Sequence, residues 1–215
     1  MEYLHWKEKM VTDFSESSLS DLYNQGFVFT RREKGLMHQT RSIRIDLSKF
    51  EITSENRRIL RKGEEIIMTP QTIPYANYSW EIGKLAKNFY DTKASGAFSA
   101  NKIKEILTTE HNFNTLLDYS GLGYSICYQN SSMIHYSYPF YDLEKAPKEM
   151  GMIMMTKVIV DAQEKGLKYV YLGSLQRPTD TYKLQLSGIE WFDGEVWQSD
   201  LEKAKMILQE IPHGN

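Results

Sequence analysis

Two groups of residues are the best candidates for chemistry in this chain. The first places four cationic side chains within six positions: Arg57, Arg58, Arg61 and Lys62. Guanidinium and ammonium groups bind phosphate oxygens by charge, and arginine adds paired hydrogen bonds. This pattern predicts contacts to a phosphate backbone. The alternative is an ordinary solvated helix face, because exposed arginines are common on helices.

The charge around this group is unusual for the chain as a whole. Residues 31–62 contain ten Lys or Arg against four Asp or Glu, whereas the 215 residues together carry a formal charge of -2. A local excess of positive charge in an acidic chain favours a surface that binds an anion or a nucleic acid. With 41% hydrophobic and 13% aromatic residues, the composition excludes a disordered chain.

The second group lies where a predicted strand ends in Phe140-Tyr141-Asp142, ahead of a predicted helix. A carboxylate at such a point can hold or deprotonate an amine. The alternative is that Asp142 is a turn residue. Lys148, with Gly151 three residues later, also suggests a helix start that can hold the pyrophosphate of acetyl-CoA.

The signatures of many enzyme classes are absent. The chain has no phosphate loop of the G-x-x-x-x-G-K-[ST] type, no G-x-S-x-G turn and no H-E-x-x-H pair. Five histidines, at positions 5, 38, 111, 135 and 213, have no neighbour at ligand spacing, so we expect neither a metal site nor a cofactor. His135 is expected to be a core or edge histidine.

The single cysteine, Cys127, excludes an intrachain disulfide and favours a reducing compartment. No apolar stretch has the length of a signal peptide or a membrane span, so no membrane partner is expected. These features predict a cytoplasmic protein.

The elements that must position these residues alternate between strands and helices. A strand over 41–47 places Arg41 and Arg44 on opposite sides, and a helix over 55–65, capped by Ser54, carries the cationic group. A long helix over 148–165 ends at Gly166 and leads into a strand over 168–173. The pattern predicts a mixed α/β (α+β) sheet in a single domain over 1–215.

Other elements follow from shorter patterns. Helices are expected over 19–23, 80–90 and 101–109, the last capped by Ser99, and a hairpin joins strands over 124–128 and 133–141. Residues 70–74, with a proline at each end, are expected to form a loop, and Ser199 with Glu202 forms a capping box for the last helix.

Several of these blocks, in this order, resemble the arginyl-tRNA:protein transferases, including the bacterial leucyl-transferring branch. The resemblance extends over most of residues 14–195. The blocks are Leu19–Tyr23, Arg41–Phe50, Arg57–Lys62, Phe140–Asp142, Tyr169–Gly173 and Tyr182–Lys183.

The resemblance implies a fold of the N-acetyltransferase (GNAT) superfamily, a mixed sheet flanked by helices. It implies transfer of arginine or leucine from tRNA to the N-terminal amine of proteins that begin with an acidic residue. The partners would be an aminoacyl-tRNA and the acceptor protein. Two alternatives remain: an acetyl-CoA-dependent N-acetyltransferase of the same superfamily, and an RNA-binding module without catalytic activity.

Within that activity, position and residue chemistry suggest a role for each candidate. The four cations at 57–62 would bind tRNA phosphates, and Arg41 or Arg44 would bind the acidic residue of the acceptor or the tRNA end. Asp142 would hold or deprotonate an amine, and Tyr141 and Lys183 would complete the catalytic pocket.

Overall fold

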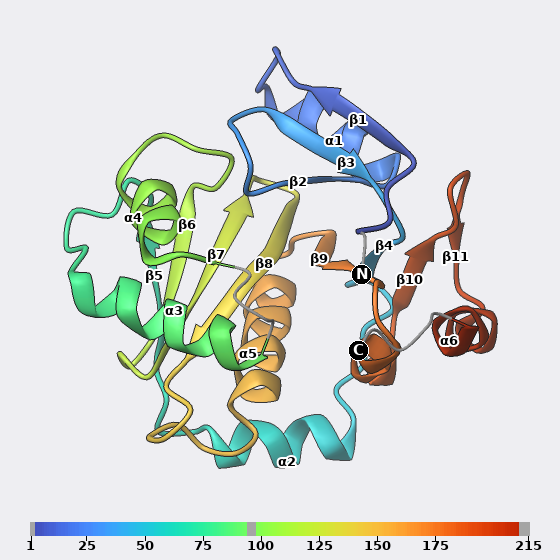
Figure 1. Cartoon of the computed structure of the whole chain (residues 1–215). Helices are drawn as coiled ribbons and strands as arrows, with labels where there is room; N and C mark the ends of the chain where they lie inside the picture. Colours follow the sequence, from blue (N-terminus) through green and yellow to red (C-terminus); the bar gives the residue numbers. More distant parts are fainter. Residues whose placement is uncertain (1–2, 94–97, 211–215) are drawn as a thin grey trace. The chain divides into compact units, whose positions relative to one another are not determined.

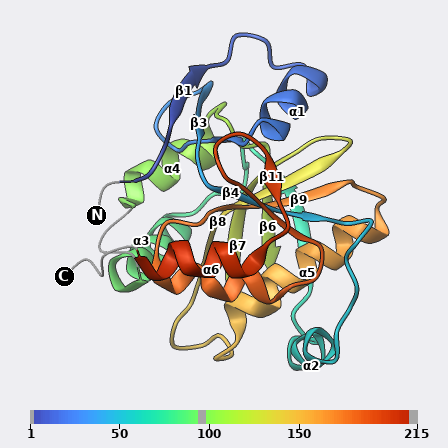
Figure 2. The same ribbon diagram turned by 90° about the vertical axis from the view of Figure 1, so that its right-hand side faces the viewer.

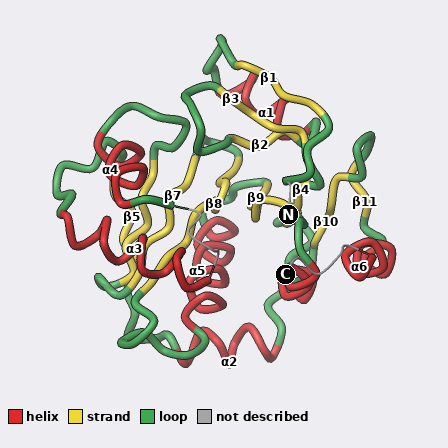
Figure 3. Tube along the Cα trace, viewed as in Figure 1, coloured by secondary structure: helices red, strands yellow, loops and turns green. Residues whose placement is uncertain are grey.

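The structure is a computed structural model that describes residues 3–93 and 98–210. Its internal contacts divide the chain into two compact units, each built from separate segments (Figure 1). Unit 1 comprises Met1–Ile52, Asn130–His135 and Ala162–Asn215, and unit 2 comprises Thr53–Gln129 and Tyr136–Asp161. A mixed α/β fold is confirmed by the helices and strands of both units (Figure 3).

Unit 1 begins with a small antiparallel sheet in the order β1-β3-β2. Its strands are β1 (Lys7–Met10), β2 (Phe27–Phe29) and β3 (Leu36–Gln39). Helix α1 (Glu16–Asn24) is capped by the Ser15 side chain and buries Leu19, Leu22 and Tyr23. Gly26, at φ +79°, supplies the left-handed turn between α1 and β2, and the helix expected over 19–23 is confirmed.

Unit 1 also contains four neighbouring strands of a larger sheet, in the order β11-β10-β4-β9. They are β4 (Ser42–Asp46), β9 (Tyr169–Ser174), β10 (Ile189–Phe192) and β11 (Trp197–Gln198), paired antiparallel. A 3-10 helix, η1 (Pro178–Gln185), follows β9, and α6 (Leu201–Glu210) contacts both η1 and β10 (Figure 2).

Unit 2 contains strands in the order β8-β7-β6-β5. They are β5 (Met68–Thr72), β6 (Thr115–Tyr119), β7 (Gly123–Gln129) and β8 (Met133–Tyr141), whose first residues belong to unit 1. The helices are α2 (Ser54–Lys62), α3 (Trp80–Lys93), α4 (Ala100–Thr108) and α5 (Met150–Glu164), which ends in unit 1. The expected Ser99 cap of α4 is confirmed.

The predicted strand-helix-strand connection is also confirmed. β8 pairs with β9 in parallel over Met133–His135, and α5 is the crossover between them. Gly166, at φ +73°, ends the crossover, as expected for a glycine in the left-handed region after a helix. Because β8 also neighbours β7, the strands form a large mixed sheet flanked by helices.

Three local predictions were wrong. Of the residues expected to form a loop, 70–74, residues 70–72 belong to β5; β5 is the last strand in the order of the described sheet, next to β6, so Pro70 lies on an edge strand, where proline is tolerated. The cap of α2 is Thr53, not Ser54, because the Thr53 hydroxyl accepts from the Asn56 amide at 3.1 Å. Asp200, not Ser199, caps α6 by accepting from Lys203 N at 3.0 Å.

Among the described helices, none is both long enough and apolar enough to cross a bilayer.

Candidate functional site

Two predicted site residues of unit 1, Arg41 and Lys183, meet at the end of β9. Arg41 Nη1 donates to the Leu175 carbonyl at 3.4 Å, and Lys183 Nζ donates to the Ser174 carbonyl at 3.0 Å. Two side chains 142 positions apart therefore bind consecutive carbonyls where the strand ends. β4 positions the arginine and η1 positions the lysine.

A polar network surrounds these cations. Gln176 Nε2 donates to Thr40 Oγ1 at 2.8 Å and to Ser174 Oγ at 3.1 Å, and Tyr3 OH lies 3.1 Å from the same Ser174 oxygen. Asp180 Oδ2 accepts from Gln176 N at 2.8 Å. The network fixes the loop that follows β9 and keeps its polar atoms hydrogen-bonded despite their burial.

Burial changes the protonation chemistry of Lys183. Desolvation lowers the pKa of the Lys183 ammonium, while Asp180, whose Oδ1 lies 3.9 Å from Nζ, acts in the opposite direction. A lysine whose pKa is lowered exchanges its proton more readily near neutral pH than a solvated one.

Arg41 also lines a cavity of about 290 Å³ in unit 1. The other lining residues are Trp191, Asp193, Glu195, Lys203 and Ile207. The walls thus carry two cations, two carboxylates, and the side chains of Trp191 and Ile207. Such a lining can receive a small group that bears both a carboxylate and an ammonium.

Arg41 lies just before β4, whereas Arg44 lies within β4, where it is buried and bound to other residues of the protein. Glu190, Arg44 and Tyr171 are register partners on three adjacent strands. Arg44 Nη2 lies 2.8 Å from Glu190 Oε2, and the guanidinium carbon lies 4.0 Å from the ring centroids of both Tyr169 and Trp197. These contacts fit a structural role.

Tyr141 and Asp142 belong to unit 2, whereas Arg41 and Lys183 belong to unit 1. Asp142 Oδ1 accepts from the amides of Glu144 at 2.9 Å and Lys145 at 3.0 Å, and these bonds lower the pKa of its carboxyl group. A carboxylate stabilised in this way is a weak base. The geometry therefore favours the turn-residue alternative for Asp142.

Tyr141 is half-buried, and this burial raises the pKa of its hydroxyl group. Its ring lies 4.8 Å from that of Phe89 on α3. A phenol with a raised pKa stays protonated at neutral pH, so Tyr141 can donate a hydrogen bond.

The four cations of the predicted phosphate-binding group all lie on α2, in unit 2. Arg58 Nε donates to Glu55 Oε2 at 2.7 Å, and Lys62 pairs with Glu149. Arg57 and Arg61 are exposed, and no carboxylate of the described residues pairs with Arg61. A phosphate that bound Arg58 or Lys62 would therefore have to displace an acidic partner.

Sequence reasoning missed Gln176 and Asp180. Gln176 bonds Leu4 and Thr40, both more than 130 positions earlier in the chain, so no local spacing indicates the network. The core assignment of His135 is confirmed: its Nδ1 lies 2.9 Å from Tyr23 OH, and burial lowers its pKa to about 3.

Comparisons with known proteins give one curated relative. The chain is 26% identical over 170 residues to the aspartate/glutamate leucyltransferase of Ruegeria pomeroyi. The match covers 74% of this chain and 61% of that protein, so the chain spans less than two thirds of the relative's length. No family model matches the sequence.

Solved structures are more distant. The C-terminal domain (DUF2156) of a protein described as a lysylphosphatidylglycerol synthetase, from Agrobacterium fabrum, aligns with a TM-score of 0.44 at 14% identity, covering 79% of this chain and 55% of that one. L-PGS from Bacillus licheniformis aligns with a TM-score of 0.43 at 15% identity, covering 74% and 50%. Likeness of this degree establishes no shared activity.

Proposed function

We propose that this chain is an aminoacyltransferase that moves leucine or arginine from tRNA to the N-terminal amine of proteins beginning with Asp or Glu. The observation that carries the proposal is the 170-residue match to the aspartate/glutamate leucyltransferase. A GNAT-like fold is part of the proposal; the parallel pair β8 and β9, joined by α5, is compatible with it.

The reaction needs no cofactor, because the donor is an activated ester. The acceptor ammonium first loses a proton, and the free amine attacks the ester carbonyl carbon. The bond from that carbon to the ribose oxygen then breaks, the oxygen takes up a proton, and the amine nitrogen loses its second proton as the amide forms. The protein must position both substrates, accept a proton and stabilise the oxyanion.

The cavity beside Arg41 is the proposed site for the acceptor. An N-terminal Asp or Glu carries a side-chain carboxylate and an α-ammonium group. Arg41 and Lys203 supply cations for the first, and Glu195 supplies an exposed carboxylate for the second. We assign the acceptor's acid to Arg41 in preference to Arg44, which Glu190 already binds.

Lys183 is the proposed proton carrier. Its ammonium is buried, its pKa is lowered by that burial, and it lies at the strand end where Arg41 also binds. Tyr141 stays a prediction for the catalytic pocket, whereas for Asp142 the turn-residue role is the one we expect. The cations of α2 stay predictions for tRNA phosphates, with Arg61 the best placed because of its exposure.

The activity is tested by incubating the protein with tRNA charged with labelled leucine or arginine and with a peptide that begins with Glu. We expect at least one of the two charged tRNAs to label the peptide. Matched peptides with N-terminal Ala or acetylated Glu should remain unlabelled, and RNase treatment of the donor should abolish transfer. Label that survives RNase treatment, or equal labelling of all three peptides, contradicts the proposal.

The same assay separates the two roles of Asp142. Asp142→Asn keeps an oxygen at Oδ1, which accepts both amide bonds, and removes only the charge. We expect an unchanged transfer rate and a melting temperature lower by about 2–4 °C at most, the shift that roughly 1 kcal/mol produces in a chain of this size. A ten- to hundredfold loss of transfer, the size of about 1.5–3 kcal/mol, would show instead that the charge serves a substrate.

A further inference from the structure

We propose that His5, Glu8 and His38 bind a divalent transition-metal ion such as Zn²⁺. All three residues belong to unit 1, at the small sheet of β1 and β3. The proposal is independent of aminoacyl transfer. It also departs from the sequence expectation, in which the histidines have no ligand neighbours.

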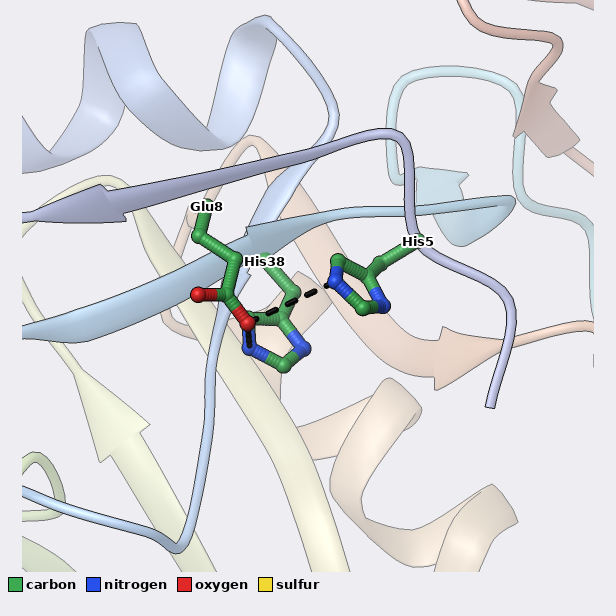
Figure 4. Close-up of side chains that lie close together, drawn as sticks. All are labelled: His5, Glu8 and His38. Carbon is green, nitrogen blue, oxygen red and sulfur yellow. Dashed lines mark ion pairs between the residues drawn. The ribbon is translucent and has the colours of Figure 1, made fainter. Parts of the chain in front are cut away.

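Strand pairing brings the three side chains together. Glu8 on β1 is the register partner of His38 on β3, so the two project from the same face of the sheet. The chain bends at Trp6, just before β1, and this bend returns His5 to that face. Figure 4 shows the Glu8 carboxylate beside a ring nitrogen of each imidazole.

The distances suit a metal ion. Glu8 Oε1 lies 3.4 Å from His5 Nε2 and 3.0 Å from His38 Nε2, and all three ligand atoms lie within 4.8 Å of one another. Ligands at about 2.0–2.1 Å from a tetrahedral Zn²⁺ are separated by roughly 3.3 Å. The two distances to Glu8 Oε1 are therefore close to their values in a bound site. The two imidazole rings stack with their centroids 4.5 Å apart, so one ring has to turn for both nitrogens to bind the same ion.

The surroundings of His5 Nδ1 and His38 Nε2 are compatible with metal binding. His5 Nδ1 lies 3.2 Å from the Tyr3 carbonyl, which accepts an N–H at Nδ1 and leaves the Nε2 lone pair for a metal. His38 Nε2 is buried and, within residues 3–93 and 98–210, has no hydrogen-bond partner, although Glu8 Oε1 lies 3.0 Å away. A buried nitrogen without a hydrogen bond is costly, and coordination would satisfy it.

The site is open to solvent, and one neighbouring cation competes with a metal ion for Glu8. The side chains of Glu8 and His5 are 47% and 33% exposed, which gives an ion a route into the site. Arg32 Nη1 lies 3.8 Å from Glu8 Oε1 and competes for that carboxylate, so Arg32 would have to turn toward solvent, where its side chain is already 67% exposed. Three protein ligands leave a fourth position for water, as in open zinc sites.

The test is metal binding to the full chain without a polyhistidine tag. Equilibrium dialysis against Zn²⁺, followed by elemental analysis, should give one ion per chain and a melting temperature that rises with Zn²⁺ concentration. Co²⁺ should give the absorption bands of a low-symmetry site with nitrogen and oxygen ligands, without thiolate charge transfer, because the lone thiol of Cys127 is buried in unit 2.

The variants change His5 and Glu8, because these two ligands are more exposed than His38 and their replacement should leave the fold intact. His5→Ala and Glu8→Gln should each weaken Zn²⁺ binding by roughly 100-fold, since loss of even an outer-shell partner costs 10- to 100-fold. Glu64→Gln, which removes an equal charge from an exposed position in unit 2, should bind Zn²⁺ as the parent does. Binding that is absent from the parent, or equal in all four proteins, overturns the proposal.

Discussion

Arg44→Met is expected to lower the free energy of unfolding by about 3 kcal/mol. Loss of one partner from a buried ion pair costs roughly 3–5 kcal/mol, because the other charge stays in a poorly solvated place. Glu190, with a side chain 13% exposed, would keep only Lys49, 2.8 Å away, so the lower end of that range applies. Loss of the stacking between Tyr169 and Trp197 acts in the same direction.

Chemical denaturation of the variant measures this effect, and a second variant identifies its cause. If the uncompensated carboxylate is responsible, adding Glu190→Gln to Arg44→Met should recover at least about 1 kcal/mol, as expected for residues that interact directly. An Arg44→Met protein that is as stable as the parent but binds acceptor peptides weakly would support the substrate-binding prediction instead.

Replacing Arg57, Arg58 and Arg61 together by alanine is expected to weaken tRNA binding strongly. Each phosphate contact adds about 0.9 to the slope of log affinity against log salt on a duplex, so three contacts should reduce that slope by roughly two to three. Because Glu55 already pairs with Arg58, a reduction nearer to two fits the structure best. The measurement is a salt titration of tRNA affinity.

A matched control removes the same charge from another part of unit 2. Lys84, Lys87 and Lys104 are exposed on α3 and α4, and their alanine triple variant should keep the parent's slope. Equal slopes for the α2 variant and the parent would support the solvated-face alternative. Equal reductions in both variants would indicate a response to net charge without a defined binding surface.

The parts of the fold that were predicted correctly depend on local signals. The crossover from β8 to β9 follows from a long apolar helix and a glycine at its end, and Ser99 marks the start of α4. β5 was missed because Pro70 is a local signal against a strand. A proline is tolerated there because β5 lies at the edge of the sheet, and that position depends on pairing with β6, over 40 residues later. β10 and β11 are short strands with weak patterns.

The candidate site was harder to predict because its contacts are distant in sequence. Alternation along the strand expected over 41–47 predicts that Arg41 and Arg44 face opposite ways, but Glu190, which pairs with Arg44, lies 146 positions later. The pairing of Glu8 with His38 likewise depends on the register of β1 and β3. Residue types therefore predicted candidate chemistry, and only the tertiary structure showed which side chains are already bound.

The central claim is tested most directly by the mass of a peptide that begins with Glu. The peptide is incubated with the protein, tRNA charged with leucine or arginine, and acetyl-CoA, and its N-terminus is sequenced by tandem mass spectrometry. The proposal predicts one added leucine or arginine on the α-amine and no acetyl group. An acetylated N-terminus would show the acetyltransferase alternative, and an unmodified peptide despite measurable tRNA binding would contradict catalysis of aminoacyl transfer.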